Sequence, residues 1–234
     1  MEATYLLNSG FLVRTDDVLL VFDAFDDPAG VLPAAVEKEN YARLYFFASH
    51  AHFDHFNPMI ARYAAKTQRY LLSEDIRSNA GAAYMPTDRT SWIGLYDAWQ
   101  DDCIAVKSFA STDEGTSFFV EVNGKSIFHA GDFNWWDWTG DTAENRKLAE
   151  NAFRKQMKRL AGLSFDLAFF PVDGRLGPSM ERGAKVFCAE TYPQALVSMH
   201  SVGYPAWKPS EGFFAVGREI PVWSPTQAGQ RHSF

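Results

Sequence analysis

Short apolar runs separated by polar turns characterise the N-terminal part of the sequence. Residues Thr4–Leu7, Phe11–Arg14 and Val18–Phe22 predict three strands, because apolar runs of this length bounded by polar residues are typical of strands. The acidic pair Asp16-Asp17 predicts a hairpin turn between the second strand and the third. The apolar run Arg43–Ser49 predicts a further, buried strand.

The same alternation continues through the rest of the chain. Asn123-Gly124 is a favoured sequence for a type I′ hairpin turn and separates two of the expected strands. Further strands are expected at Arg69–Leu72, Cys103–Phe109, Ser117–Val122, Lys125–Ala130, Asp166–Val172 and Ala195–Met199.

One long amphipathic pattern, Thr142–Ala161, predicts a helix. Asp141 is its expected N-cap, Glu144 completes a capping box, and Gly162 ends the helix. The expected inward face consists of Leu148, Ala152, Phe153, Met157 and Leu160. Shorter helices are expected at Pro58–Lys66 and near Ser179–Glu190. The proline-containing residues 205–225 are expected to be irregular, and the mixture of strands and helices favours layered α/β or α+β packing.

The composition fits one globular domain over residues 1–234, because 47% of the residues are hydrophobic and can form a sizeable core. With 22 basic and 29 acidic residues the net charge is −7, which disfavours a nucleic-acid-binding protein with a clustered positive surface. No apolar run approaches the ~18–20 residues that span a bilayer, and the N-terminal residues do not resemble a signal peptide. Cys103 and Cys188 give no disulfide framework, so we expect a cytoplasmic protein that does not bind membranes.

A cluster of potential metal ligands follows the strand expected at residues 43–49. Three of the six histidines lie within six residues, in the sequence His-Ala-His-Phe-Asp-His. Because alternate residues of an extended segment face the same way, His50 and His52 can bind one ion. Asp54 and His55, where the chain turns, can face a second ion. The alternative is a solvated histidine-rich loop.

Two further candidate ligands also follow apolar strands. Asp132 comes just after the strand expected at 125–130, and His200 just after the strand expected at 195–199. In layered α/β folds, functional groups cluster in loops beyond the carboxyl ends of strands. Three separate strand ends therefore carry metal-binding side chains, which scattered core histidines would not do.

These motifs resemble those of the metallo-β-lactamase superfamily over nearly the whole chain. The resemblance rests on His-Ala-His-Phe-Asp-His at 50–55, His-Ala-Gly-Asp at 129–132 and Ser-Met-His at 198–200. The N-terminal strands, with Asp23 after the third, are similar as well, and the UlaG-like or Zn-dependent hydrolase-like branch is the most similar. The resemblance implies a four-layer αββα sandwich: two β-sheets face to face, helices outside, and a metal site at one rim.

The resemblance also implies a role for each ligand. His50 and His52 would bind a first metal ion, Asp54, His55 and His200 a second, and Asp132 would bridge both. One or two divalent ions are expected, Zn²⁺ in the first place and Mn²⁺ or Fe²⁺ as alternatives. A metal-bound hydroxide would be the nucleophile, and Asp54 would orient it and later protonate the leaving group. Asp23 would accept a hydrogen bond from a ligating histidine.

One ligand that the resemblance implies is missing. The superfamily supplies a third histidine to the first metal from a loop that corresponds here to residues 106–115, which contain no histidine. Ser111 is the expected occupant of that position, and a hydroxyl is a poor ligand for zinc. Three outcomes are open: a weak first site, a replacement carboxylate from Asp113, or a preference for Mn²⁺ or Mg²⁺ completed by water.

Residues near the expected rim are candidates for substrate binding. Asp173 is a possible partner of a ligating histidine, and Arg175 a possible binder of an anionic substrate, although a turn built by Asp-Gly explains the segment equally well. Trp135 and Trp136 would either wall an apolar pocket or pack into the core.

The sequence therefore predicts a metal-dependent hydrolase that cleaves an ester, lactone, amide or phosphodiester bond in a small molecule. The alternative is a metal-binding protein of the same fold without hydrolytic turnover, with a structural or ligand-sensing role. The sequence does not indicate an oligomeric state.

Overall fold

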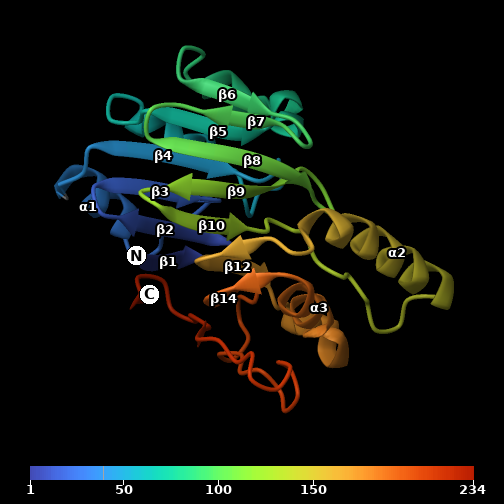
Figure 1. Cartoon of the computed structure of the whole chain (residues 1–234). Helices are drawn as coiled ribbons and strands as arrows, with labels where there is room; N and C mark the ends of the chain where they lie inside the picture. The colour runs from blue at the N-terminus through green and yellow to red at the C-terminus, as the bar shows by residue number, and fades with distance from the viewer. Residues whose placement is uncertain (39) are drawn as a thin grey trace.

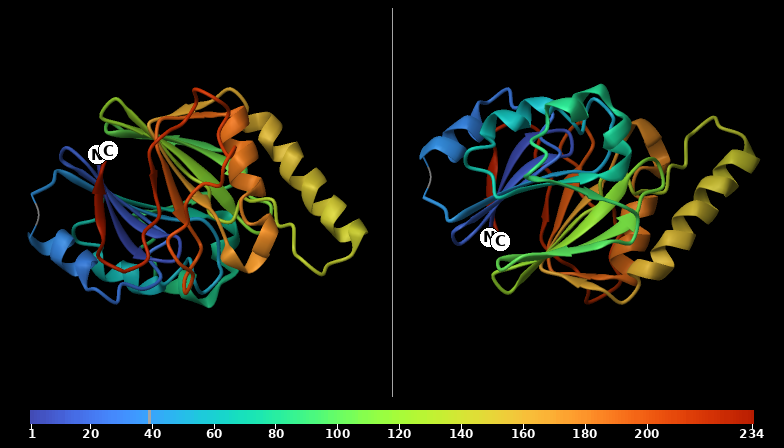
Figure 2. Two further views of the ribbon diagram at one scale, coloured as in Figure 1. Left: turned by 90° about the horizontal axis from the view of Figure 1, so that it is seen from below. Right: turned by 90° about the horizontal axis from the view of Figure 1, so that it is seen from above.

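The computed structural model describes residues 1–38 and 40–234. Two seven-stranded β-sheets lie face to face, and helices cover their outer faces (Figures 1 and 2). This helix–sheet–sheet–helix order confirms the four-layer αββα sandwich predicted from the sequence.

The first sheet contains the N-terminal strands in the order β16-β1-β2-β3-β4-β5-β6. Its strands are β1 (Glu2–Leu7), β2 (Gly10–Thr15), β3 (Val18–Phe22), β4 (Arg43–Ala48), β5 (Arg69–Ser73), β6 (Thr90–Ile93) and β16 (Arg231–Ser233). Strands β3 to β6 are parallel, while β2 and β3 form the predicted antiparallel hairpin around Asp16-Asp17. The predictions for β1 to β5 are confirmed, whereas the edge strands β6 and β16 were not predicted.

The second sheet has the order β15-β14-β12-β10-β9-β8-β7. Its strands are β7 (Ala98–Gln100), β8 (Ile104–Ala110), β9 (Thr116–Val122), β10 (Lys125–His129), β12 (Leu167–Pro171), β14 (Leu196–Met199) and β15 (Val222–Trp223). Asn123 and Gly124 both have positive φ, 50° and 68°, as the predicted type I′ turn between β9 and β10 requires. The short strand β15 corrects the prediction that residues 205–225 are irregular throughout. Two further short strands, β11 (Ser164–Phe165) and β13 (Tyr192–Pro193), pair with each other.

The helices lie on both outer faces of the sandwich (Figure 2). They are α1 (Val31–Lys38), α2 (Ala143–Leu160), α3 (Arg182–Glu190) and the 3₁₀ helices η1 (Pro58–Tyr63), η2 (Glu74–Ser78), η3 (Ala80–Tyr84) and η4 (Gly174–Ser179). The helix predicted at 58–66 is thus a shorter 3₁₀ helix, and α1 was not predicted. Of the helices in the described ranges, none is both long enough and apolar enough to cross a bilayer.

The N-terminus of α2 differs from its prediction. Thr142 is the N-cap, since its side chain accepts a hydrogen bond from the Asn145 amide. Asp141 lies one residue earlier and accepts hydrogen bonds from the Thr142 amide and the Asn145 side chain. The predicted capping box of Asp141 and Glu144 is therefore wrong.

The inner face of α2 is also narrower than predicted. Phe153 and Met157 are fully buried and Leu160 nearly so, but Leu148 and Ala152 are exposed. The first half of this helix projects beyond the sheet, as Figure 1 shows, so apolar side chains there are not covered by the sheet.

Strand β3 shows how the layers are held together. All five of its residues are buried, and successive side chains face opposite sides. Val18, Leu20 and Phe22 join the core between the sheets. Leu19 and Val21 join a second core under α1 and the 3₁₀ helices. The sheet is thus covered on both faces, which explains why its strands are almost continuously apolar.

Candidate metal centre

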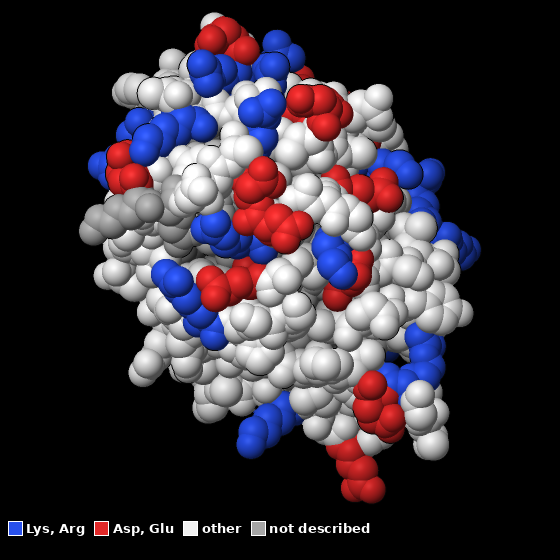
Figure 3. Space-filling view, turned by 60° about the vertical axis from the view of Figure 1, so that its left-hand side comes forward, with Lys and Arg blue, Asp and Glu red and all other residues white. Residues whose placement is uncertain are grey.

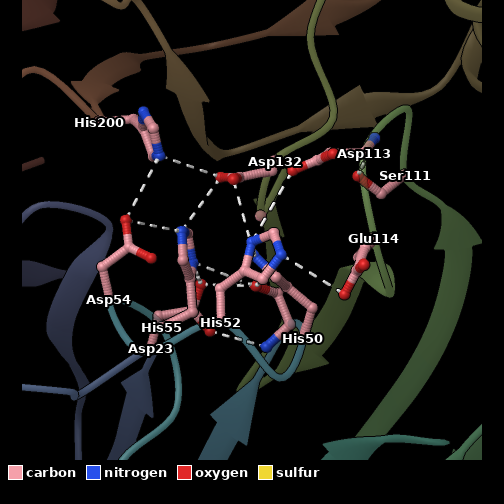
Figure 4. A network of polar contacts seen from close by, with 12 residues as sticks. Asp23, His50, His52, Asp54, His55, Ser111, Asp113, Glu114, Asp132 and His200 are labelled. Carbon is pink, nitrogen blue, oxygen red and sulfur yellow. Dashed lines mark hydrogen bonds and ion pairs between the residues drawn. The ribbon is translucent and has the colours of Figure 1, made fainter. Parts of the chain in front are cut away.

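All the predicted ligands lie at one edge of the sandwich. Parallel strands end at the same edge, so the residues directly after β3 and β4 meet there, as do those after β10, β12 and β14. Strand β8 runs in the same direction as β10, because each pairs antiparallel with β9. The loop of residues 111–115 after β8 therefore reaches this edge as well. Figure 4 shows the resulting network of polar side chains.

A tight turn after β4 presents the histidine motif. The amides of His55 and Phe56 both donate to the carbonyl oxygen of His52, at 3.1 and 3.0 Å. The Ala51 amide donates to Asp75 from η2 at 2.8 Å. These bonds hold residues 50–55 in one compact turn.

The first donor group contains His50, His52, Asp113 and Asp132. The Nε2 atom of His50 lies 2.9 Å from Nδ1 of His52 and 3.6 Å from Oδ2 of Asp132. Oδ2 of Asp113 lies 3.8 Å from the same Nδ1 of His52. One nitrogen or oxygen from each of the four residues thus points into a common space.

The second donor group contains Asp54, His55 and His200. Oδ2 of Asp54 lies 3.8 Å from Nε2 of each histidine. Both nitrogens also face Oδ1 of Asp132, at 3.2 Å for His55 and 3.5 Å for His200. Asp132 therefore faces the first group with one carboxylate oxygen and the second group with the other (Figure 4).

The donor set fits divalent cations. Nε2 of His55 and Oδ1 of Asp132 are buried and have no hydrogen-bond partner in the described structure. Buried polar atoms without partners are rare and costly, so these two atoms call for a bound group. Imidazole and carboxylate are the ligands that Zn²⁺, Mn²⁺ and Fe²⁺ accept. A pair of cations in the two donor groups would satisfy both atoms.

Asp23 fixes the orientation of His55. Its Oδ2 lies 2.7 Å from Nδ1 of His55, so Nε2 of the ring is the atom that faces the donor group. The same carboxylate accepts hydrogen bonds from the amide and the hydroxyl of Ser49, each at 2.7 Å. Asp23 is 1% exposed, and its φ of 43° is unusual for a residue other than glycine. Asp23 therefore combines a strained backbone with a carboxylate that is hydrogen-bonded through both oxygens. It contacts His55, as the predicted partner of a ligating histidine would.

Asp173 does the same for His200. Its Oδ2 lies 3.1 Å from Nδ1 of His200, which leaves Nε2 facing the donor group. The guanidinium of Arg175 donates to both oxygens of Asp173, from Nε to Oδ1 at 3.0 Å and from Nη2 to Oδ2 at 2.5 Å. Asp173 also accepts from the Arg175 amide at the start of η4. Asp173 therefore both builds the turn at residues 173–175 and contacts His200, two roles that the sequence left as alternatives.

The ionisation of the donors depends on their burial and on one another. Burial alone would lower the pKa of His55, but the carboxylates of Asp23 and Asp132 together outweigh it and raise that pKa to about 10. Burial, with His55 beside it, lowers the pKa of His50 to about 4. Burial would raise the pKa of Asp132, but the surrounding imidazoles hold it well below its usual range. At neutral pH His50 is therefore unprotonated, whereas a cation at His55 must displace a proton.

Of the two candidates for the missing ligand, Asp113 and Ser111, it is Asp113 that groups with His50, His52 and Asp132. The Ser111 hydroxyl accepts a hydrogen bond from the Asp113 amide at 3.2 Å, and in Figure 4 it lies beyond Asp113 from the histidines. Asp113 therefore belongs to the donor group, whereas a ligand role for Ser111 stays a prediction. A replacement carboxylate, one of the three outcomes left open by the sequence, is the one that the geometry supplies.

A cleft of about 590 Å³ opens beside the two donor groups. Trp136 and Trp138 line it with their rings stacked 5.8 Å apart, and Arg175 lies 5.5 Å from the ring of Trp138. Trp136 also donates to the carbonyl oxygen of Asp132 at 2.9 Å. Trp135 instead packs against Phe153 of α2 and does not line this cleft, so of its two predicted alternatives the structure shows packing against the core.

One residue of the site was missed in the sequence. Nδ2 of Asn8 donates to Oδ2 of Asp54 at 3.0 Å. Strand β1 runs in the same direction as β3, because both pair antiparallel with β2, so Asn8 also follows a strand end at this edge. The strand-end rule that selected the other residues would have found it.

Solved structures share this architecture, although no protein-family model matches the chain and no curated protein matches it in sequence. Igni18, a metallo hydrolase from the archaeon Ignicoccus hospitalis, has a TM-score of 0.64 at 17% identity, over 100% of this chain and 98% of that one. YhfI from Bacillus subtilis, a metallo-β-lactamase fold protein, has a TM-score of 0.61 at 12% identity, over 99% of both chains. The chain has the metallo-β-lactamase fold.

A third structural neighbour shows how far this likeness extends. CmlA from Streptomyces venezuelae, a diiron β-hydroxylase, has a TM-score of 0.57 at 11% identity, over 85% of this chain and 44% of that one. At these identities the likeness concerns the fold, and it does not single out the UlaG-like branch. The metallo-β-lactamase fold thus accounts for the position of the site, and the chemistry has to be argued from the residues in it.

Proposed function

We propose that this protein is a metal-dependent hydrolase that uses two divalent cations to cleave a bond in a small molecule. The observation that carries the proposal is the pair of donor groups that share Asp132, with the unpartnered atoms of His55 and Asp132 between them. Bound cations would supply Lewis acidity to the bond under attack and activate water for the attack.

Asp54 is the residue placed to move a proton. Its side chain is 27% exposed, belongs to the second donor group and also lines the cleft. The hydrogen bond from Asn8 to Oδ2 fixes the orientation of the carboxylate. Asp54 would therefore hold a proton at a carboxylate oxygen and deliver it to the leaving group on the side of the cleft.

The cleft supports a small-molecule substrate. Its volume lies within the range of small-ligand pockets, roughly 300–1,000 Å³. Trp136 and Trp138 offer apolar ring faces, and Arg175, whose side chain is 54% exposed, offers positive charge at the same wall. The net charge is −7, and on the face shown in Figure 3 basic and acidic side chains are interspersed, so neither observation indicates the clustered positive surface that a nucleic-acid backbone requires. The proposed substrate has a flat apolar part and an anionic or polar group.

The test is a turnover panel with metal-replete protein. Ester, lactone, amide and phosphodiester substrates with aromatic groups would each be assayed with Zn²⁺, Mn²⁺ and Fe²⁺. Asp54→Asn should lower kcat about 10²-fold or more on the active class, as loss of an acid–base group does. Asp88→Asn changes a carboxylate that is 78% exposed and pairs with Arg89, and it should leave kcat unchanged.

A second candidate is a metal-binding protein of the same fold without hydrolytic turnover. The carboxylate of Asp113 at a position where the superfamily has a histidine is the observation that favours it. Two tightly bound ions per chain without turnover on any substrate class would support this candidate and contradict the hydrolase. Purified protein that binds no divalent cation at neutral pH would contradict both.

A further inference from the structure

The loop of residues 111–115 brings carboxylates to the more open side of the centre. Asp113 and Glu114 both lie within 4 Å of His52, but at different ring nitrogens. Asp113 faces Nδ1, the nitrogen that also faces His50, whereas Glu114 faces Nε2 at 3.5 Å. The two neighbouring carboxylates therefore have different relations to the first donor group.

We propose that Asp113 is a protein ligand of the cation held by His50 and His52, and that its carboxylate shifts this site away from zinc and toward Mn²⁺ or Fe²⁺. The inference rests on the cation binding in the proposed function, and it does not depend on hydrolysis. Glu114, in contrast, lies on the far side of the partly exposed His52 ring and is not a ligand.

The loop is fixed directly to the turn that carries the histidines. The Thr116 amide donates to the carbonyl oxygen of Ser49 at 2.8 Å. Gly115 has a φ of +65°, and a Cβ there would lie 2.0 Å from that oxygen and 2.6 Å from Cβ of His50. Only glycine permits this approach, which sets the distance between Asp113 and the histidines.

Buried atoms next to Asp113 indicate that a cation belongs here. Asp132 is 4% exposed, and its Oδ1 has no hydrogen-bond partner, while its Oδ2 faces His50. Among the residues in the described ranges, no lysine or arginine lies within ion-pair distance of Asp113 or Asp132. Two carboxylates that converge on histidines, with no lysine or arginine in the described ranges beside them, match the needs of a bound metal ion.

The resulting donor set differs from that of a zinc site rich in histidine. With Asp132 shared, each donor group offers two imidazoles, a carboxylate of its own and the shared carboxylate. Carboxylates suit Mn²⁺, and two histidines with one carboxylate are the common ligand set of non-haem Fe²⁺. Zinc still binds more tightly than manganese at most sites of either kind, so the informative quantity is how the ratio of the two affinities changes.

The experiment measures cation affinity on protein stripped of metal. Kd values for Zn²⁺ and Mn²⁺ would be obtained by competition with a chelator, and the number of bound Mn²⁺ ions by electron paramagnetic resonance. We expect Asp113→Asn to lower the affinity for one of the two Mn²⁺ ions by at least about tenfold. Asp113→His should raise the preference for Zn²⁺ over Mn²⁺ by at least about tenfold. Glu114→Gln, the matched control, should change each Kd by less than about threefold.

Two results would overturn the inference. One is unchanged Mn²⁺ affinity and stoichiometry in Asp113→Asn, above all if Glu114→Gln weakens binding instead. The other is an unchanged ratio of affinities in Asp113→His. Asp113 is about half exposed, so the variants should fold, and circular dichroism of each variant verifies this. An inactive wild-type protein that binds two ions would contradict the hydrolase and leave this inference supported.

Discussion

Two buried carboxylates on one segment, Asp132 and Asp137, differ in the partners that the protein provides for their negative charge. Both are almost inaccessible, at 4% and 2% exposure. Asp137 is neutralised by the protein itself: Arg146 donates to both of its oxygens at 2.5 and 3.0 Å, and Arg182 and the Ser179 hydroxyl also donate to it. Asp132 has no such partners and keeps one oxygen without a hydrogen bond.

The difference separates a structural carboxylate from a functional one. Asp137 ties α2 and α3 to the loop after β10 through arginines on each helix. Its hydrogen bond with Arg146, helped by Ser179 and Arg182, lowers its pKa to about 2. At Asp132 the chain instead places imidazoles, which are weaker counter-charges and good metal ligands. A buried carboxylate that the protein surrounds with imidazoles instead of arginines therefore marks the place for an external cation.

The largest expected effect comes from exchanging each carboxylate for its amide. Asp132→Asn should weaken binding of both cations by at least about 100-fold, because it removes the donor that they share. Asp137→Asn should leave cation affinity unchanged but lower the free energy of unfolding by about 2 kcal/mol, since it breaks a partly buried ion-pair network. Isothermal titration calorimetry and urea denaturation measure the two quantities. Equal losses of cation affinity in both variants would show that the clusters are one network.

The next effect is the loss of stability when metal is removed. At a free cation concentration 100 times Kd, one bound ion stabilises the native state by about 2.7 kcal/mol. For a chain of this size that corresponds to a Tm about 5–10 °C higher than after chelation. Thermal denaturation with and without chelator tests this. The shift should persist in Asp137→Asn and vanish in Asp132→Asn, and a shift retained in Asp132→Asn would mean that the stabilising ion binds elsewhere.

The smallest effect appears in acid. The pKa of Asp137 is about 2 in the folded chain and 3.8 ordinarily, so its ion pairs stabilise the fold above pH 4. This contribution, about 2 kcal/mol at 1.36 kcal/mol per pKa unit, is lost as the pH falls from 4 to 2. Urea denaturation of metal-free protein at pH 4.5 and 2.5 measures how much the free energy of unfolding falls in acid. This decrease should be smaller in Asp137→Asn than in the wild type. An identical decrease in both would refute the role assigned to Asp137.

Much of the fold could be predicted because apolar runs and turn residues report buried strands directly. The hairpins at 16–17 and 123–124 are fixed by local sequence, so they were predicted correctly. The failures are elements defined by tertiary contact. Strand β6 carries an apolar residue only at some positions, and Leu148 has helical spacing in a part of α2 that lies beyond the sheet. Periodicity predicts a face, but only packing decides whether that face is covered.

The candidate site was predictable where ligands follow strands and unpredictable within loops. The positions of Asp132 and His200 follow from strand direction alone. The choice between Ser111 and Asp113 depends on how closely the loop packs at Gly115 against the turn after β4. The sequence does not reveal this packing. Likewise, adjacent tryptophans take opposite directions: Trp136 reaches the cleft, while Trp135 faces α2.

The compact turn at residues 50–55 has a consequence for the chain before it folds. Four of the seven potential ligands lie within these six residues, so they remain neighbours when the two sheets are apart. An unfolded chain therefore keeps some affinity for metal, which subtracts from the stabilisation that the ion gives to the native state. During synthesis this segment emerges before Asp113, Asp132 and His200 exist. A cation captured there would travel with the nascent chain, and the residues at the edge of the second sheet would complete its coordination last.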